Sequence, residues 1–122
     1  MAHFSALVIG DGFEEALKPY SEFRYSGEYG TNPDGHYEYW KLSEHRNLVT
    51  KDGKTVMQGR VGEIDWDVTD IPSAVVTKDG KWHEEGWRFM DNFDREWAAT
   101  FKERFVAPLE PDDLVTVVDC HV

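Results

Sequence analysis

The residue types best able to do chemistry lie at the two ends of the chain. His3 lies near the N-terminus, and the consecutive residues Asp119, Cys120 and His121 lie near the C-terminus. If the two ends pair as antiparallel strands, these four residues come close together. Such a set would bind zinc, or would pair a thiolate with a base for nucleophilic chemistry.

The same four residues have a plainer interpretation, which we favour. Neighbours on a strand point to opposite faces, so Cys120 and His121 cannot both reach one ion without a bulge or a distortion of the chain end. Cys120 is then a buried small hydrophobe, and the histidine is exposed or hydrogen bonded.

A second set combines acidic and aromatic side chains in the middle of the chain. Aromatic rings surrounded by charges of one sign are typical of protein interfaces, where the rings supply contact area and the acids attract a basic partner. The alternative is that the rings fill a small second core, which we expect for at least half of the aromatic residues in this region. The candidate contacts are Asp65, Trp66, Asp67, Trp82, Glu84 and Glu85.

Motifs of known enzyme classes are missing from the sequence. It has no Gly-x-x-x-x-Gly-Lys loop, no Gly-x-Ser-x-Gly elbow and no His-Glu-x-x-His helix. His36, His45 and His83 show no metal-ligand spacing, and adjacent carboxylates such as Asp112 and Asp113 are expected to be solvated. We therefore expect no cofactor, and a protein that is not an enzyme.

The charge balance narrows the choice of partner. The chain has 122 residues, with 24 acids against 13 bases and a formal net charge of -11. Because phosphate contacts need basic patches, we expect no direct nucleic acid and no membrane as partner, and a basic protein surface instead. Solubility alone is the plainer explanation of the charge. A single cysteine, no signal-peptide pattern and no apolar run of ~18 residues together favour a reducing cytoplasm.

Two terminal strands must position the first set of residues. The segment Leu114–Val122 is mostly Val, Leu and Cys, which predicts an interior strand, and His3–Ile9 is the only comparable run and its natural partner. In that first strand, every second residue from Phe4 onward should point to one face, and every second residue from Leu7 onward to the other. Both faces of the sheet must therefore be covered.

Two helices and two hairpins are predicted between these strands. A short helix carries Phe13 and Leu17 and ends at Pro19, and a longer one spans Asp91–Ala107, with four aromatic residues spaced four apart. The hexapeptide Val-Thr-Lys-Asp-Gly-Lys occurs at 49–54 and at 76–81. Shared Asp-Gly turn chemistry explains this repeat better than a duplication does.

These elements predict a single α+β domain over residues 1–122, with an irregular, aromatic-rich insertion at about 20–72 after the first helix. Without the insertion, the order is βαββαβ, the split βαβ or ferredoxin-like arrangement. In it, the terminal strands pair antiparallel and both helices lie on one face. The insertion or a second subunit should cover the other face.

Both ends of the chain resemble a known group of proteins. His3-Phe4 followed by Leu7-Val-Ile-Gly10, and the closing Thr116-Val-Val-Asp-Cys-His121, resemble a family of small uncharacterised proteins encoded by bacteriophages and prophages. Those relatives carry an aspartate with two tryptophans and a Gly-Arg-Trp stretch near the centre, where this chain has Tyr39-Trp40. The resemblance implies a phage origin and no settled activity.

A phage origin favours an inhibitor of host machinery. We expect a phage-encoded, non-enzymatic inhibitor of a host defence or nucleic-acid-processing complex, similar to anti-CRISPR proteins that mimic DNA. It would bind a basic surface of a host protein, such as a CRISPR–Cas or other defence effector, in the cytoplasm of the bacterial host, with a homodimer as a further option. The alternative is a small metal-binding protein or enzyme that uses the cluster at the paired termini.

Overall fold

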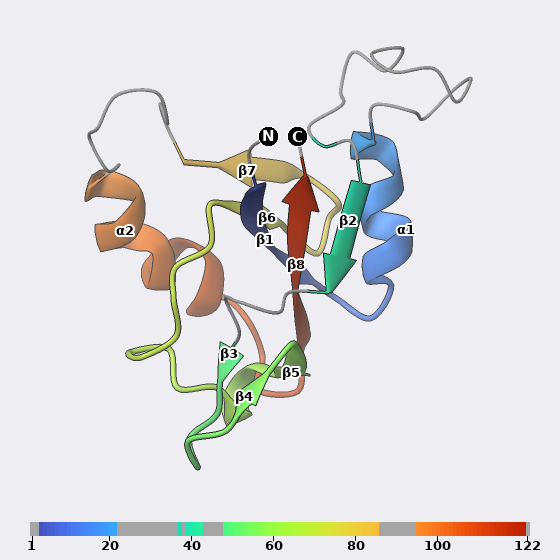
Figure 1. Cartoon of the computed structure of the whole chain (residues 1–122). Coiled ribbons are helices and arrows are strands. Elements are labelled where there is room, and N and C mark those ends of the chain that lie inside the picture. The colour runs from blue at the N-terminus through green and yellow to red at the C-terminus, as the bar shows by residue number, and fades with distance from the viewer. Residues whose placement is uncertain (1–2, 22–36, 38, 43–47, 86–94, 122) are drawn as a thin grey trace.

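A computed structural model describes residues 3–21, 37, 39–42, 48–85 and 95–121, with the backbone alone at residues 3, 39, 95 and 121. Its core is a mixed sheet with the strand order β2-β8-β1-β6-β7, and β5 also pairs with β8 (Figure 1). In chain order the elements are β1 (His3–Ile9), α1 (Phe13–Leu17), the 3-10 turn η1 (Lys18–Tyr20), β2 (Tyr39–Leu42), β3 (Leu48–Val49), β4 (Thr55–Val56), β5 (Gln58–Arg60), the 3-10 turn η2 (Val61–Glu63), β6 (Ala74–Val76), β7 (Trp82–Glu84), α2 (Arg95–Phe101), the π-helical turn η3 (Lys102–Val106) and β8 (Leu114–His121).

β8 lies inside the sheet, as its apolar composition predicted. It pairs antiparallel with β1 along one side, from His3 opposite His121 to Ile9 opposite Val115. Along its other side it pairs with β2 near its end and with β5 near its start. The two termini consequently lie next to each other (Figure 1). This confirms the predicted antiparallel pairing of the first and last strands.

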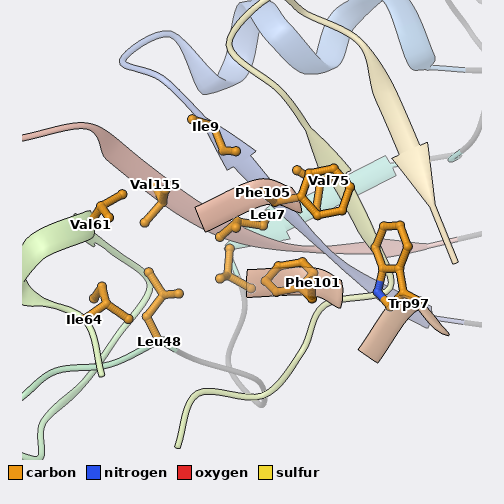
Figure 2. Packing of buried hydrophobic residues seen from close by; sticks show 11 residues of the cluster. Leu7, Ile9, Leu48, Val61, Ile64, Val75, Trp97, Phe101, Phe105 and Val115 are labelled. Atoms are coloured by element: carbon orange, nitrogen blue, oxygen red, sulfur yellow. The ribbon is translucent and has the colours of Figure 1, made fainter. Parts of the chain in front are cut away.

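Two apolar clusters cover the two faces of the sheet, and they follow the predicted alternation of β1. On the face that carries α1, here called the α1 face, Leu17 packs with Phe4, Ala6 and Val8. On the opposite face, the α2 face, Trp97, Phe101 and Phe105 pack with strand residues that include Leu7, Ile9, Val75 and Val115 (Figure 2). Both faces of β1 are thus buried, as expected.

The structure is of the α+β class, but the ferredoxin-like arrangement is not confirmed. In that arrangement the second strand of the hairpin pairs with the first strand of the chain. Here the first hairpin strand, β6, pairs parallel with β1, and β7 lies at the sheet edge. The two helices also lie on opposite faces, whereas one shared face was predicted.

The reason for this difference lies in where the chain goes after α1. It does not return to the hairpin but forms β2, which is parallel to β1 because both are antiparallel to β8. The connection from β1 to β2 passes β8 and runs across the sheet in the direction away from β6. The connection from β7 to β8 runs across the sheet in the same direction, but the two strands that it joins are antiparallel to β1 and β2. When both crossovers have the usual right-handed sense, their helices must lie on opposite faces.

The region expected to be an irregular insertion contributes strands and core. Its described part holds β2 to β5. β2 and β5 pair with the second edge of β8, and β3 and β4 pair with each other. Leu48, Val61 and Ile64 complete the apolar cluster of the α2 face (Figure 2), while Tyr37 and Trp40 pack on the α1 face. These residues contribute to both faces, and each face also carries a helix, so the helix-free face that the insertion was expected to cover does not exist. Residues 22–36, 38 and 43–47 lie outside the described residues.

Both predicted hairpins form, and their turns have the same geometry. Gly53 and Gly80 have positive φ angles of 86° and 80°, which glycine adopts without strain. In each turn a threonine hydroxyl donates a hydrogen bond to the aspartate two residues later, Thr50 to Asp52 and Thr77 to Asp79. The β3–β4 hairpin forms a separate two-stranded sheet and the β6–β7 hairpin joins the main sheet, so the repeated hexapeptide makes one local turn in two settings.

The second helix buries three of its four evenly spaced aromatic residues. Trp97, Phe101 and Phe105 are buried, and Phe93, with the predicted start at residues 91–94, lies outside the described residues. The helix closes in the turn η3, where the Ala107 amide donates to the Lys102 carbonyl oxygen over 2.8 Å, just before Pro108. No helix in the described part of the chain is long and apolar enough to cross a membrane.

Candidate functional site

The paired ends of β1 and β8 bring the first set of candidate residues into one register. His3 lies opposite His121, Phe4 opposite Cys120 and Ser5 opposite Asp119. β2 extends this register on the far side of β8, with Trp40 opposite Cys120 and Lys41 opposite Asp119. The predicted proximity of the four terminal residues is therefore correct at the level of the backbone.

The side chain of Cys120 lies on the face of the sheet opposite to that of Asp119. Its side chain is fully buried on the α1 face, next to Phe4 and Tyr37. Burial in this apolar cluster raises the pKa of the thiol to about 12, and the nearby Asp119 carboxylate adds to the effect. A thiol with this pKa is neither a ready nucleophile nor a ready zinc ligand. The structure thus places Cys120 as the small core hydrophobe that we favoured.

Tyr37 shares this buried corner. Its hydroxyl donates a hydrogen bond of 2.8 Å to the Leu17 carbonyl oxygen. Burial, with a smaller effect of the neighbouring Cys120, raises the pKa of the phenol above its ordinary value. The ring therefore joins the start of β2 to the end of α1 as a neutral group.

Asp119 lies on the α2 face, together with Ser5. This follows from strand alternation, because Phe4 and Cys120 belong to the cluster of the α1 face. Ser5 is only 5% exposed, and its Oγ has no hydrogen-bond partner among the described residues. We did not single out Ser5 from the sequence. The signal that would have found it is its spacing of two residues from His3, combined with the register.

No group of three or more His, Cys, Asp or Glu side chains within the described residues is arranged to hold a metal ion. The side chains of His3 and His121 fall outside this statement, because the structure describes only their backbone.

The acidic and aromatic set divides into two groups on opposite faces of the sheet. Trp82 packs on the α1 face, with its ring 5.9 Å from that of Phe4 and 5.2 Å from that of Tyr20. Strand alternation in β7 places Glu84 on the same face, and Glu85 follows the strand. This half of the set therefore borders the core beside α1.

The other half of the set packs beside the opposite core. Trp66 is partly buried against the cluster of the α2 face, and its Nε1 donates to the Val61 carbonyl oxygen over 3.3 Å. Asp67 is exposed and forms an ion pair with Lys102 at the start of η3. The hydrogen bond from Lys102, helped by its charge, lowers the pKa of the Asp67 carboxyl. The six residues thus do not form one surface.

The segment Asp65–Ile71 presents apolar and acidic side chains to solvent together. Val68 is 58% exposed, the highest value among the large apolar side chains that the structure describes as exposed, and Ile71 is 36% exposed. Asp67 and Asp70 beside them are exposed as well. Sequence reasoning included Asp67 but missed Val68, Asp70 and Ile71. The sequence signal for this segment was an apolar residue, Val68, that lies between acids and outside any predicted strand.

Hydrogen bonds fix the backbone of this segment. The Asp65 amide donates to the Val49 carbonyl oxygen, and Asp65 Oδ1 accepts from the Asp67 amide, over 2.8 and 3.1 Å. The Thr69 hydroxyl donates to the Asp65 carbonyl oxygen and accepts from the Val49 amide, over 2.8 and 3.0 Å. The exposed side chains are therefore carried on a turn that the β3 strand holds in place.

Comparison of the chain with protein-family models, curated proteins and solved structures gives no significant match. The resemblance to phage proteins therefore stays a prediction.

Proposed function

We propose that this chain is a phage-encoded binding protein that inhibits a defence or nucleic-acid-processing complex of the bacterial host, in the host cytoplasm, without catalysing a reaction. The observation that carries the proposal is the segment Asp65–Ile71, where exposed acids and exposed apolar side chains share one hydrogen-bonded turn. Its partner is a basic protein surface with an apolar centre.

The charge of the segment suits such a partner. Asp67 and Asp70 are exposed, and the whole chain carries a formal net charge of -11. Acids around an apolar contact steer a basic partner and raise the rate of association. The surface that a nuclease uses to hold nucleic acid is basic, and an acidic protein competes for it.

The apolar side chains supply contact area. Val68 and Ile71 are both exposed large hydrophobic residues in the described structure. Burying an apolar side chain of this size contributes roughly 1.5–3 kcal/mol. Because hydrogen bonds to β3 already order the turn, little conformational entropy is lost on binding.

A matched pair of charge reversals tests the proposal. The variant Asp67→Lys/Asp70→Lys changes the contact segment, and Glu14→Lys/Glu15→Lys changes two exposed acids on α1 by the same net charge. The wild type should capture a nuclease or effector complex from a lysate that contains CRISPR–Cas and restriction systems, and should inhibit the purified complex. Raised salt should weaken capture.

The segment variant should lose inhibition and the α1 variant should keep it. Equal loss in both folded variants would show that net charge acts without a specific surface, and an unchanged segment variant would remove Asp65–Ile71 from the proposal. A wild type that captures and inhibits no such complex would contradict the proposed function itself. Thermal unfolding of each variant checks that it is folded.

A further inference from the structure

We propose that the outer edge formed by β2 and β5 is a self-association site, where a second copy of this chain adds its own β2 and β5 by antiparallel strand pairing. The product is a closed dimer with a two-fold axis at Met57. This inference is independent of the proposed contact segment Asp65–Ile71, which is not part of the edge.

β2 and β5 act together as one edge strand, although a hairpin separates them in the sequence. β2 pairs with residues 118–121 of β8, and β5 pairs with residues 114–116. Met57 occupies the position between them, because its carbonyl oxygen accepts a hydrogen bond of 2.8 Å from the Val117 amide. Residues 39–42 and 57–60 therefore form one continuous row along β8, here called the composite edge.

The hydrogen bonds to the β8 segment fix which backbone groups of the composite edge point out of the sheet. The Met57 carbonyl oxygen points toward Val117, and the Val61 amide donates to the Asp113 carbonyl oxygen over 2.9 Å. Because the bonding direction alternates along an antiparallel strand, every second residue of the row points its N–H and C=O groups the other way. These outward-facing residues are Trp40, Leu42, Gln58 and Arg60.

The composite edge is open to a partner. Among the described residues, β2 and β5 pair with β8 alone. Leu42 is 39% exposed and Met57 is 38% exposed, and these two apolar residues occupy adjacent positions at the centre of the row. The hairpin that separates β2 from β5 packs on the α2 face, where Leu48 and Val56 join the apolar cluster.

The pattern of the composite edge is complementary to itself, which favours a second copy as the occupant. An antiparallel register centred on Met57 places Leu42 opposite Gln58 of the second copy, and Trp40 opposite Arg60 of the second copy. All outward-facing residues are then paired, with about eight backbone hydrogen bonds, two for each opposed pair. Every other register leaves some of these groups unpaired. Because both copies use the same edge, the assembly closes at two.

The side chains fit the same register. Strand alternation places Met57 on the α2 face and Leu42 on the α1 face. At the two-fold axis the two Met57 side chains meet directly, and the two Leu42 side chains approach diagonally. The guanidinium of Arg60 lies beside the Trp40 ring of the second copy, a favourable cation–π arrangement. The composite edge contains no acidic residue, so the acids behind the net charge of -11 lie outside it.

A guarded edge is the competing explanation. Basic side chains on an edge strand oppose pairing with another chain, and Lys41 and Arg60 belong to the composite edge. In that case the chain stays monomeric. A measurement of molecular mass in solution therefore decides between the two explanations.

The test uses the full chain, measured by sedimentation over a range of concentrations and without any host protein. We expect a reversible dimer and an unfolding temperature that rises with protein concentration. Met57→Lys puts like charges opposite each other at the two-fold axis, and should raise the dissociation constant about tenfold or more. Val68→Lys is the matched control. It adds the same charge at an exposed apolar residue outside the composite edge, and should leave the dimer intact.

Cysteine substitutions test the register. In a Cys120→Ala background, Met57→Cys should link two copies by a disulfide on mild oxidation, because Cα atoms opposed at the axis are about 4.5 Å apart. Arg60→Cys should form no such link, because the same position of the second copy lies at the far end of the pairing. Thermal unfolding shows that each variant is folded.

Four results would each overturn the proposal. They are a wild type that stays monomeric up to its solubility limit, a dimer that survives Met57→Lys, a dimer that Val68→Lys abolishes as fully as Met57→Lys does, and equal disulfide linkage through Arg60→Cys. None of these results depends on whether the chain inhibits a host complex.

Discussion

The indole Nε1 of Trp97 donates a hydrogen bond of 2.9 Å to the carbonyl oxygen of Pro72. Both residues are buried. Pro72 immediately follows the segment Asp65–Ile71, so the bond ties the end of that segment to α2, while Thr69 ties its middle to β3. The proposed contact segment is therefore held at two points by buried groups, and its conformation depends on the packing of the α2 face.

Replacing Trp97 by phenylalanine tests this link. The variant keeps an aromatic ring but leaves the buried Pro72 carbonyl oxygen unpaired, so we expect a loss of about 1–3 kcal/mol in the free energy of unfolding. Trp66→Phe is the matched control. Its partner, the Val61 carbonyl oxygen, also accepts from the Ile64 amide and stays satisfied. Urea denaturation of both variants measures the difference, and equal losses would contradict the assigned role of the Trp97 bond.

Gly62 is the position where a side chain should be least tolerated in the η2 turn. A Cβ at this site would lie 3.0 Å from Pro111 Cβ and 3.3 Å from the Pro111 carbonyl oxygen, which accepts a hydrogen bond from the Gly62 amide. Overpacking of this kind costs about 1–3 kcal/mol, so Gly62→Ala should unfold at lower urea concentration. At Gly12, the N-cap of α1, no atom lies within 4 Å of an added Cβ, so Gly12→Ala should show no overpacking and only the N-cap difference between glycine and alanine, about 1 kcal/mol or less. If Gly62→Ala leaves the free energy of unfolding unchanged, the loop at Pro111 must move to make room for the added methyl group.

The buried thiol of Cys120 predicts a fall in stability at high pH. Its pKa rises from the ordinary 9.0 to about 12 in the folded chain, chiefly through burial. Between these two values the unfolded chain loses the thiol proton while the folded chain keeps it, so the free energy of unfolding falls as pH rises from 9 to 12. Urea denaturation across this range measures the slope.

Cys120→Ala should flatten that slope but not abolish it, because burial also raises the pKa of Tyr37. A thiol reagent at pH 8 gives an independent measurement: it should label the unfolded chain much faster than the native one. Rapid labelling of the native protein, or an unchanged slope in Cys120→Ala, would show that the thiol is reached by solvent.

Several local features of this fold follow from short-range sequence patterns. The period of two in His3–Ile9 predicted which side chains share a face, and the structure confirms it. The Asp-Gly pairs predicted both hairpin turns, because glycine alone accepts the positive φ angle there without strain. The spacing of Trp97, Phe101 and Phe105 predicted a buried helix face. Each of these patterns is set within a few residues, where sequence is a sufficient guide.

The candidate sites depended on contacts that no local pattern specifies. Trp66 and Trp82 looked like members of one surface, but Trp66 packs against the cluster of the α2 face and Trp82 against that of the α1 face. Ser5 gains significance only from its pairing with Asp119, and Val68 only from its exposure.

Sequence by itself determined the antiparallel pairing of the two ends, because they are the two long apolar runs and each needs a partner to satisfy its backbone groups. It also determined that both faces of the first strand are buried. Only the tertiary structure decided that β2 pairs with β8 on the side away from β1, that the helices cover opposite faces, and that Cys120 lies on the face covered by α1. These choices depend on register and crossover direction, which are set by contacts between residues far apart in the chain.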